Sequence, residues 1–180
     1  MVVGSTARAP IAGQSPDQPR PWVSAGGGWA LHLANDRSYT FSVAHVEDLV
    51  IGWKIAGHSL ATETLFAEST YGDADTCTSV TRPCPQIYGL AGGAILFQLD
   101  HPAADGTPPR VAIFEGLGIY SVRAPKTGNH TAPALQTDID MAILREDHFD
   151  VVLGIKWIVM PKVRGDFLSA VPFTAGLRLW

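Results

Sequence analysis

The sequence predicts an all-β fold, specifically an eight-stranded antiparallel up-and-down β-barrel. Apolar and polar residues alternate with a period of two in several segments, which is the side-chain period of a strand. Turn-forming residues separate these segments, and the 18 glycines and 13 prolines are more than a long helical bundle tolerates. About eight strands result, and closing them into a meander removes the exposed edges of the sheet.

The first half of the chain contains four candidate strands. Residues 22–34 carry three consecutive glycines before Trp29, a pattern typical of a curved strand. Residues 38–56 form one long strand or two short ones, because Leu49, Ile51 and Trp53 alternate with other residues. Residues 60–70 and 87–99 follow. The last of these segments is apolar on both faces, and its glycines permit curvature and close approach inside a small barrel.

The second half contains four more candidate strands. Residues 110–123 form a strand with central glycines, and residues 135–145 form another, although a helix would also place Leu135, Ile139 and Ala142 together. The clearest alternation covers residues 149–160, where one face is wholly apolar, and residues 171–180 repeat it. The predicted turns include residues 102–109, 125–133 and 164–166, which are rich in Pro, Gly and Asp. Residues 1–20 are expected to be a flexible lead-in, and residues 21–180 a single barrel domain.

Three segments carry a family resemblance. The first is Arg110-Val111-Ala112-Ile113-Phe114-Glu115-Gly116-Leu117-Gly118-Ile119-Tyr120-Ser121-Val122-Arg123, the second is residues 149–159, and the third is Val171-Pro172-Phe173-Thr174-Ala175-Gly176-Leu177-Arg178-Leu179-Trp180. They are similar to a Gly-x-Gly-x-Tyr strand, the penultimate strand and the closing strand of the small eight-stranded outer-membrane β-barrels of Gram-negative bacteria. The resemblance implies a barrel in the bacterial outer membrane, with the lipid bilayer as its partner.

The strand faces opposite the apolar rows contain most of the charged strand residues of the second half of the chain. If the apolar rows face lipid, these charges point into the barrel, whose interior at eight strands is just wide enough for side chains. Buried charges must pair, so we expect an internal ion network of Asp138, Asp140, Asp150, Lys156 and Arg178. The alternative for Asp138 and Asp140, on one face of one strand, is a catalytic carboxylate pair.

Composition limits the other function classes. The net charge of −4 and the absence of adjacent Lys or Arg residues argue against nucleic-acid binding. The sequence contains no run of 18 apolar residues, so it predicts no transmembrane helix. The six histidines are scattered without metal-ligand spacing, so neither a metal nor a cofactor is expected. Cys77 and Cys84 lie in a turn-rich segment, and six intervening residues favour a disulfide over free thiols or a metal site.

The sequence leaves three functional interpretations open. The first is a non-catalytic integral outer-membrane barrel with a structural or surface-loop binding role. The second is a soluble barrel, cytoplasmic or secreted, that holds a small apolar ligand in its lumen as a lipocalin-like carrier or a cyclase, with Glu63, Glu115 and Tyr120 as candidate luminal groups. The third is a β-sandwich subunit whose apolar faces meet protein partners. The first interpretation requires apolar residues outside and paired charges inside, whereas the second requires the reverse.

Overall fold

The computed structural model describes residues 20–34, 42–55, 58–69, 89–99, 110–124, 128–146, 148–163 and 166–179. These residues form β1 (Arg20–Ala34), β2 (Ser42–Ile55), β3 (His58–Ser69), β4 (Gly89–Gln98), β5 (Val111–Ala124), β6 (Gly128–Arg145), β7 (Phe149–Val163) and β8 (Asp166–Leu179). The predicted lead-in up to residue 19 and the two cysteines, Cys77 and Cys84, lie outside the described residues. Within the described part, no helix is long and apolar enough to cross a membrane.

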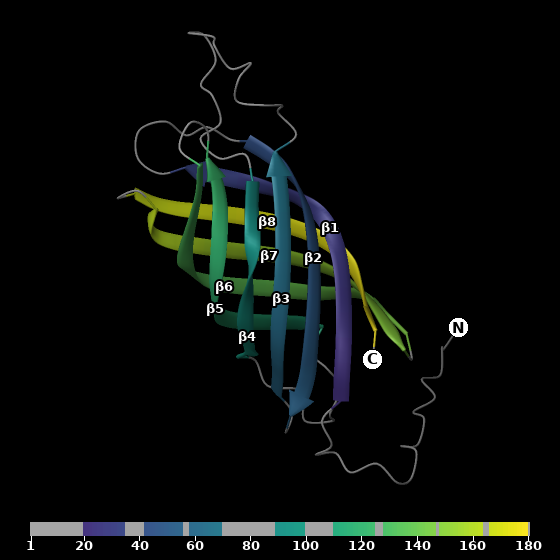
Figure 1. Cartoon of the computed structure of the whole chain (residues 1–180). Coiled ribbons are helices and arrows are strands. Elements are labelled where there is room, and N and C mark those ends of the chain that lie inside the picture. Colours follow the sequence, from purple (N-terminus) through teal and green to yellow (C-terminus); the bar gives the residue numbers. More distant parts are fainter. Residues whose placement is uncertain are drawn as a thin grey trace, which may run out of the picture.

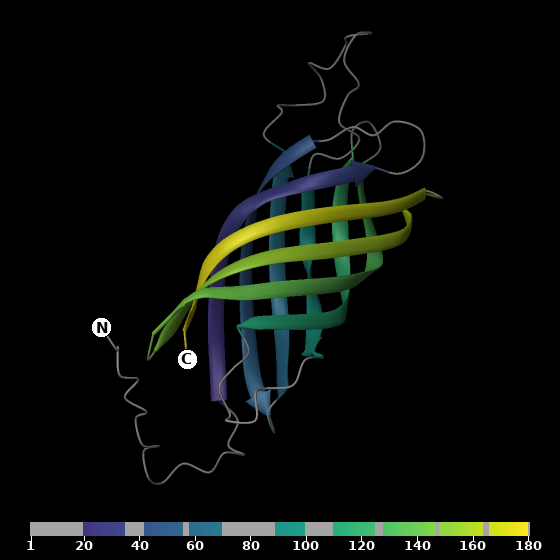
Figure 2. The ribbon, with the colours of Figure 1, turned by 180° about the vertical axis from the view of Figure 1, so that it is seen from behind.

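Each strand pairs antiparallel with the next one in sequence, and β8 pairs with β1, which closes the barrel. In Figure 1, β1, β2 and β3 stand on the near side while β6, β7 and β8 cross behind them at a steep angle. Seen from behind in Figure 2, the yellow β8 lies directly beside the purple β1. The predicted closed eight-stranded up-and-down barrel is therefore confirmed.

The cross-strand partners define the stagger of the barrel. Starting at Val23 and moving from each residue to its partner on the next strand, one passes around the barrel through Ile51, Thr62, Ile95, Leu117, Leu135, Val159 and Ser169. Ser169 in turn pairs with Leu33, which lies ten residues beyond Val23 on β1. Such a stagger requires the strands to tilt by roughly 35–45° from the barrel axis. The tilt brings residues from distant strands to the same depth inside the barrel.

The apolar rows face outward. On β7 the residues Leu153, Ile155 and Trp157 are exposed, whereas the residues between them are buried. The same alternation continues around the barrel, with exposed Phe66, Phe97, Ile113, Ile139, Phe173 and Leu177 on the other strands. The orientation expected for a membrane barrel, with apolar residues outside and charges inside, is the one observed.

The structure corrects two local predictions on β6. The segment 125–133 was expected to be a turn, but β6 begins at Gly128 and pairs with β5 from there on. Proline is tolerated here because Pro133 lies beyond the last described β6–β7 partners, Leu135 and Val159. Strict alternation from Asp138 and Asp140 through Ala142 predicts that Leu144 also lies inside, but the register shifts between Ala142 and Leu144, and Leu144 is exposed. The helical alternative for residues 135–145 is wrong.

The end of the barrel nearer the β1–β2 connection is filled by apolar side chains. Its buried residues include Ala30, Val46, Leu90, Val122, Met160 and Ala170, each at most 1% exposed. The Tyr120 ring lies over two glycines: a Cβ on Gly92 would lie 2.6 Å from Tyr120 Cδ1, and a Cβ on Gly118 would lie 2.7 Å from Cε2. Glycine is needed at both positions to admit this ring, and the resulting apolar layer closes the lumen on that side.

Candidate functional site: an internal ion network

Below the apolar layer, Lys156 occupies the centre of the lumen. Its Nζ atom lies 3.1 Å from Asp48 Oδ2, 3.1 Å from Glu63 Oε1 and 3.3 Å from Asp138 Oδ2. All four side chains are more than nine-tenths buried. Asp138 is the cross-strand partner of Lys156, whereas Asp48 and Glu63 reach it from β2 and β3. Barrel closure therefore assembles three carboxylates around one ammonium group.

Gln136 connects this cluster to Tyr120. The Gln136 Nε2 atom donates to Glu63 Oε2 at 2.7 Å and to Asp138 Oδ1 at 2.8 Å. The Tyr120 hydroxyl donates to Gln136 Oε1. Because both ends of the Gln136 amide are used, the amide holds two carboxylates in place and satisfies the buried phenol at the base of the apolar layer.

Two further ion pairs extend the network toward the end of the barrel where β8 finishes. Arg178 on β8 pairs with Asp140 on β6, and its guanidinium lies 4.7 Å from the centre of the Trp22 ring. Arg145 Nε lies 3.2 Å from Asp150 Oδ1. The bulge after Ala142 is what turns Arg145 inward, because it moves Leu144 to the outer face.

The five residues expected in an ion network are distributed over three clusters. The structure brings Asp138 to Lys156 and Asp140 to Arg178, whereas Asp150 contacts Arg145 instead of either expected cation. Sequence reasoning did not place Arg145, Gln136 or Asp48 in the network. The inward position of Asp48 could have been predicted from the sequence, because Asp48 alternates with the outward Leu49 and Ile51. The inward orientation of Arg145 could not have been predicted in this way, because it depends on the bulge after Ala142.

The three candidate luminal groups are also divided. Glu63 and Tyr120 lie inside, at 3% and 0% exposure, but Glu115 is exposed on the outer face. Glu115 and Tyr120 are five positions apart on one strand, so alternation places them on opposite faces. The suggestion that Glu115 lines the lumen is therefore wrong.

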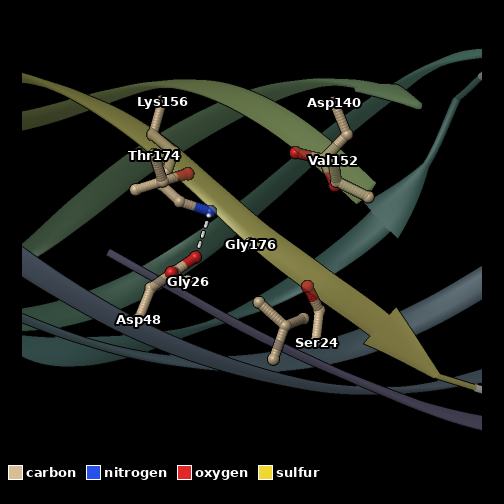
Figure 3. A pocket seen from close by; sticks show the side chains of 9 residues that line it. Ser24, Gly26, Asp48, Asp140, Val152, Lys156, Thr174 and Gly176 are labelled. Carbon is tan, nitrogen blue, oxygen red and sulfur yellow. Dashed lines mark ion pairs between the residues drawn. The ribbon is translucent and has the colours of Figure 1, made fainter. Parts of the chain in front are cut away.

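A cavity of about 10 Å³ lies between Lys156, Asp48, Asp140 and Thr174. Figure 3 shows the Lys156 ammonium pointing across it to the Asp48 carboxylate, with Thr174 beside them. This volume is about that of one water molecule. In the described strands and connections, no three His, Cys, Asp or Glu side chains are arranged so as to hold a metal ion.

Comparison with known proteins places this fold among outer-membrane barrels. Neisserial surface protein A superposes with a TM-score of 0.59 and 14% identity, over 91% of this chain and 99% of that protein. Ail, the attachment invasion locus protein of Yersinia pestis, was solved with the heparin analogue sucrose octasulfate and superposes at 0.50 with 10% identity, over 91% and 99%. No family model and no curated protein sequence matches the chain. The predicted likeness to small eight-stranded outer-membrane barrels is confirmed at the level of the fold.

Proposed function

We propose that this protein is a non-catalytic integral outer-membrane β-barrel whose role is structural or consists of binding through the segments that join its strands. The observation that carries the proposal is the inside-out distribution of side chains. The charged groups of the lumen are paired with one another, and the exposed surface of the strands is predominantly apolar.

The apolar surface supports insertion into lipid because of its extent. Large apolar residues are exposed on every strand, among them Trp29, Leu49, Phe66, Ile95, Leu117, Leu135, Ile155 and Leu177. Soluble monomers rarely expose contiguous apolar patches larger than a few hundred Å². A transmembrane barrel requires such a belt, about 25 Å tall, because its outer face replaces water with lipid chains.

The filled lumen supports a role that does not depend on transport or on a luminal ligand. The cavity beside Lys156 has about 10 Å³, whereas ligand pockets usually enclose about 300–1,000 Å³. The inner charges contact one another and leave no room for a substrate between them. The lipocalin-like or cyclase alternative is therefore not favoured by the geometry, and binding is assigned to the outside.

The segments at the β1–β2 end of the barrel are the candidates for binding. Residues 35–41, 70–88, 125–127 and 164–165, which join the strands at this end, contain three aspartates, three arginines and one lysine, so their charge is nearly balanced. They also contain three tyrosines, Tyr39, Tyr71 and Tyr88. This composition favours a partner that is contacted through aromatic and polar groups. It does not favour a sulfated polyanion of the kind bound to Ail.

Vesicle flotation tests the membrane assignment. The urea-unfolded chain is diluted into buffer with or without phosphatidylcholine vesicles, and the vesicles are washed with carbonate and floated on a density gradient. We expect the washed vesicles to retain the chain with its strands protected from trypsin. A chain that is folded and monodisperse in detergent-free buffer would overturn the proposal. A co-purified apolar ligand, identified by mass spectrometry, would support the luminal alternative instead.

A further inference from the structure

Glu115 places a carboxyl group in the middle of the lipid-facing surface. Along β5, the outward residues on one side of it are Val111 and Ile113, and those on the other side are Leu117 and Ile119; all four are exposed. At about 3.3 Å per residue and a tilt of roughly 40°, the span from Val111 to Ile119 covers about 20 Å of the apolar belt. Glu115 lies at the centre of this span.

The neighbouring strands do not provide an ionic partner for this carboxyl group. Its cross-strand neighbours are Phe97 on β4 and Thr137 on β6. Among the described residues, the structure gives the side-chain carboxyl group of Glu115 no hydrogen bond and no ion pair. A charged or strongly polar group at this depth is destabilising in lipid, so a partner that supplies hydrogen bonds would stabilise it.

Thr137 supplies the complementary donor. It is the direct partner of Glu115 across β5 and β6, it shares the outward face, and it is flanked by exposed Leu135 and Ile139. The outer face around Glu115 and Thr137, which we name the β5–β6 face, therefore presents one acceptor and one hydroxyl donor side by side at nearly the same depth. The residues around them are apolar.

We propose that the β5–β6 face is the contact between two copies of this chain in the bilayer, in which each Glu115 carboxyl group accepts a hydrogen bond from the partner's Thr137 hydroxyl. The proposal rests on membrane insertion as proposed above. Two copies inserted in the same direction have the same depth, so a twofold axis along the bilayer normal brings the two faces together with donors opposite acceptors. Hydrogen bonds between membrane segments stabilise association in this way, and apolar side chains pack around them.

Energy transfer between labelled copies in lipid tests this proposal. Copies labelled with a donor or an acceptor dye at the N-terminal amine are mixed in phosphatidylcholine vesicles, and transfer is followed as lipid is added. We expect Glu115→Leu to require about tenfold more protein per lipid for half-maximal transfer, since each symmetric hydrogen bond contributes to association. Thr137→Val should act in the same direction, and Glu115→Gln, which keeps an acceptor, should retain association.

Glu47→Leu is the matched control. Glu47 is also an outward carboxylate, but it lies on β2 beside His45, 3.5 Å away, and outside the β5–β6 face. Association should not change in this variant. Inserted wild-type chain whose transfer equals that of randomly distributed monomers would overturn the proposal, and so would Glu115→Leu that associates like the wild type. Failure of the wild type to float with vesicles would instead contradict the membrane assignment and the dimer together.

Discussion

Lys156 is the single residue on which the polar interior depends most directly. Three carboxylates lie within 3.3 Å of its ammonium group, on three different strands, and the side chain is almost completely buried. Taking such groups out of water is costly, and only their mutual attraction and the Gln136 hydrogen bonds offset that cost. Removing the one cation leaves several carboxyl groups without compensation.

Replacement Lys156→Met is therefore expected to lower the free energy of unfolding by about 3–5 kcal/mol, since it breaks a buried ionic cluster from one side. Urea unfolding in vesicles, followed by tryptophan fluorescence, measures the loss. The exposed Glu47→Gln should change stability by less than about 0.5 kcal/mol. Adding Glu63→Gln to Lys156→Met should recover part of the loss, and an unchanged urea midpoint for Lys156→Met would contradict this account of the cluster.

At the scale of the elements, the strands depend on glycines that admit large side chains from neighbouring strands. Gly52 on β2 is the partner of Trp22 on β1, and a Cβ at Gly52 would lie 2.2 Å from Trp22 Cε2. The Trp22 ring is buried, tilted against Phe114 at 6.3 Å and contacted by Arg178. The ring therefore cannot move aside without disturbing two other strands.

Gly52→Ala should destabilise the barrel by about 1–3 kcal/mol through overpacking. Gly27→Ala is its matched control, because a Cβ at Gly27 faces outward and meets only Val46 O at 3.4 Å. This control should be neutral or stabilising by up to about 1 kcal/mol, since alanine restricts the unfolded chain. Thermal unfolding in the same detergent compares the two variants. Equal losses in both would show that β propensity, and not the contact with Trp22, decides the effect.

The sequence is sufficient to predict the strands whose alternation is uninterrupted. In residues 149–160 and 171–180 the period of two alone predicts which side chains share a face, and the structure confirms this for 149–160 and for 171–179, whereas Trp180 lies outside the described residues. The start of β6 could not be predicted, because Gly128 and Pro133 are turn formers that pairing with β5 keeps in a strand. The bulge near Leu144 could not be predicted either, since nothing in the local composition marks it.

The ion network was only partly predictable for a different reason. Alternation identifies which charges point inward, and it correctly places Asp138, Asp140, Asp150, Lys156 and Arg178 on that side. It does not identify partners across the lumen. The contacts of Lys156 with Asp48 and Glu63 depend on the stagger of the closed barrel, which is a property of all eight registers together.

At the scale of the whole molecule, the solvent of the outer face decides how a substitution behaves. Ile155 and Leu179 are almost equally exposed, at 47% and 49%. Ile155 lies in the middle of β7 with apolar residues on both sides, whereas Leu179 is the last residue of β8. In water the two positions would be equivalent, but in a bilayer they lie at different depths.

Ile155→Arg should therefore lower stability by about 2–4 kcal/mol in vesicles, while Leu179→Arg should cost about 0–1 kcal/mol. Urea titrations of refolding into phosphatidylcholine vesicles measure both values. Both variants should still fold, so the protection of their strands from trypsin should be the same. Equal and small effects of the two arginines, within about 0.5 kcal/mol, would mean that the outer face is in contact with water.

The contacts of Arg178 couple the two ends of the chain. Arg178 belongs to the last strand, its carboxylate partner Asp140 belongs to β6, and the ring beneath it, Trp22, belongs to the first strand. Asp140 therefore gains this counter-charge only when β8 has joined the sheet. A chain stopped before β8 has an open sheet, an unpaired acid and an uncovered tryptophan at once. Closure of the sheet by β8, neutralisation of Asp140 and the contact of Arg178 with Trp22 are therefore expected to occur in one step.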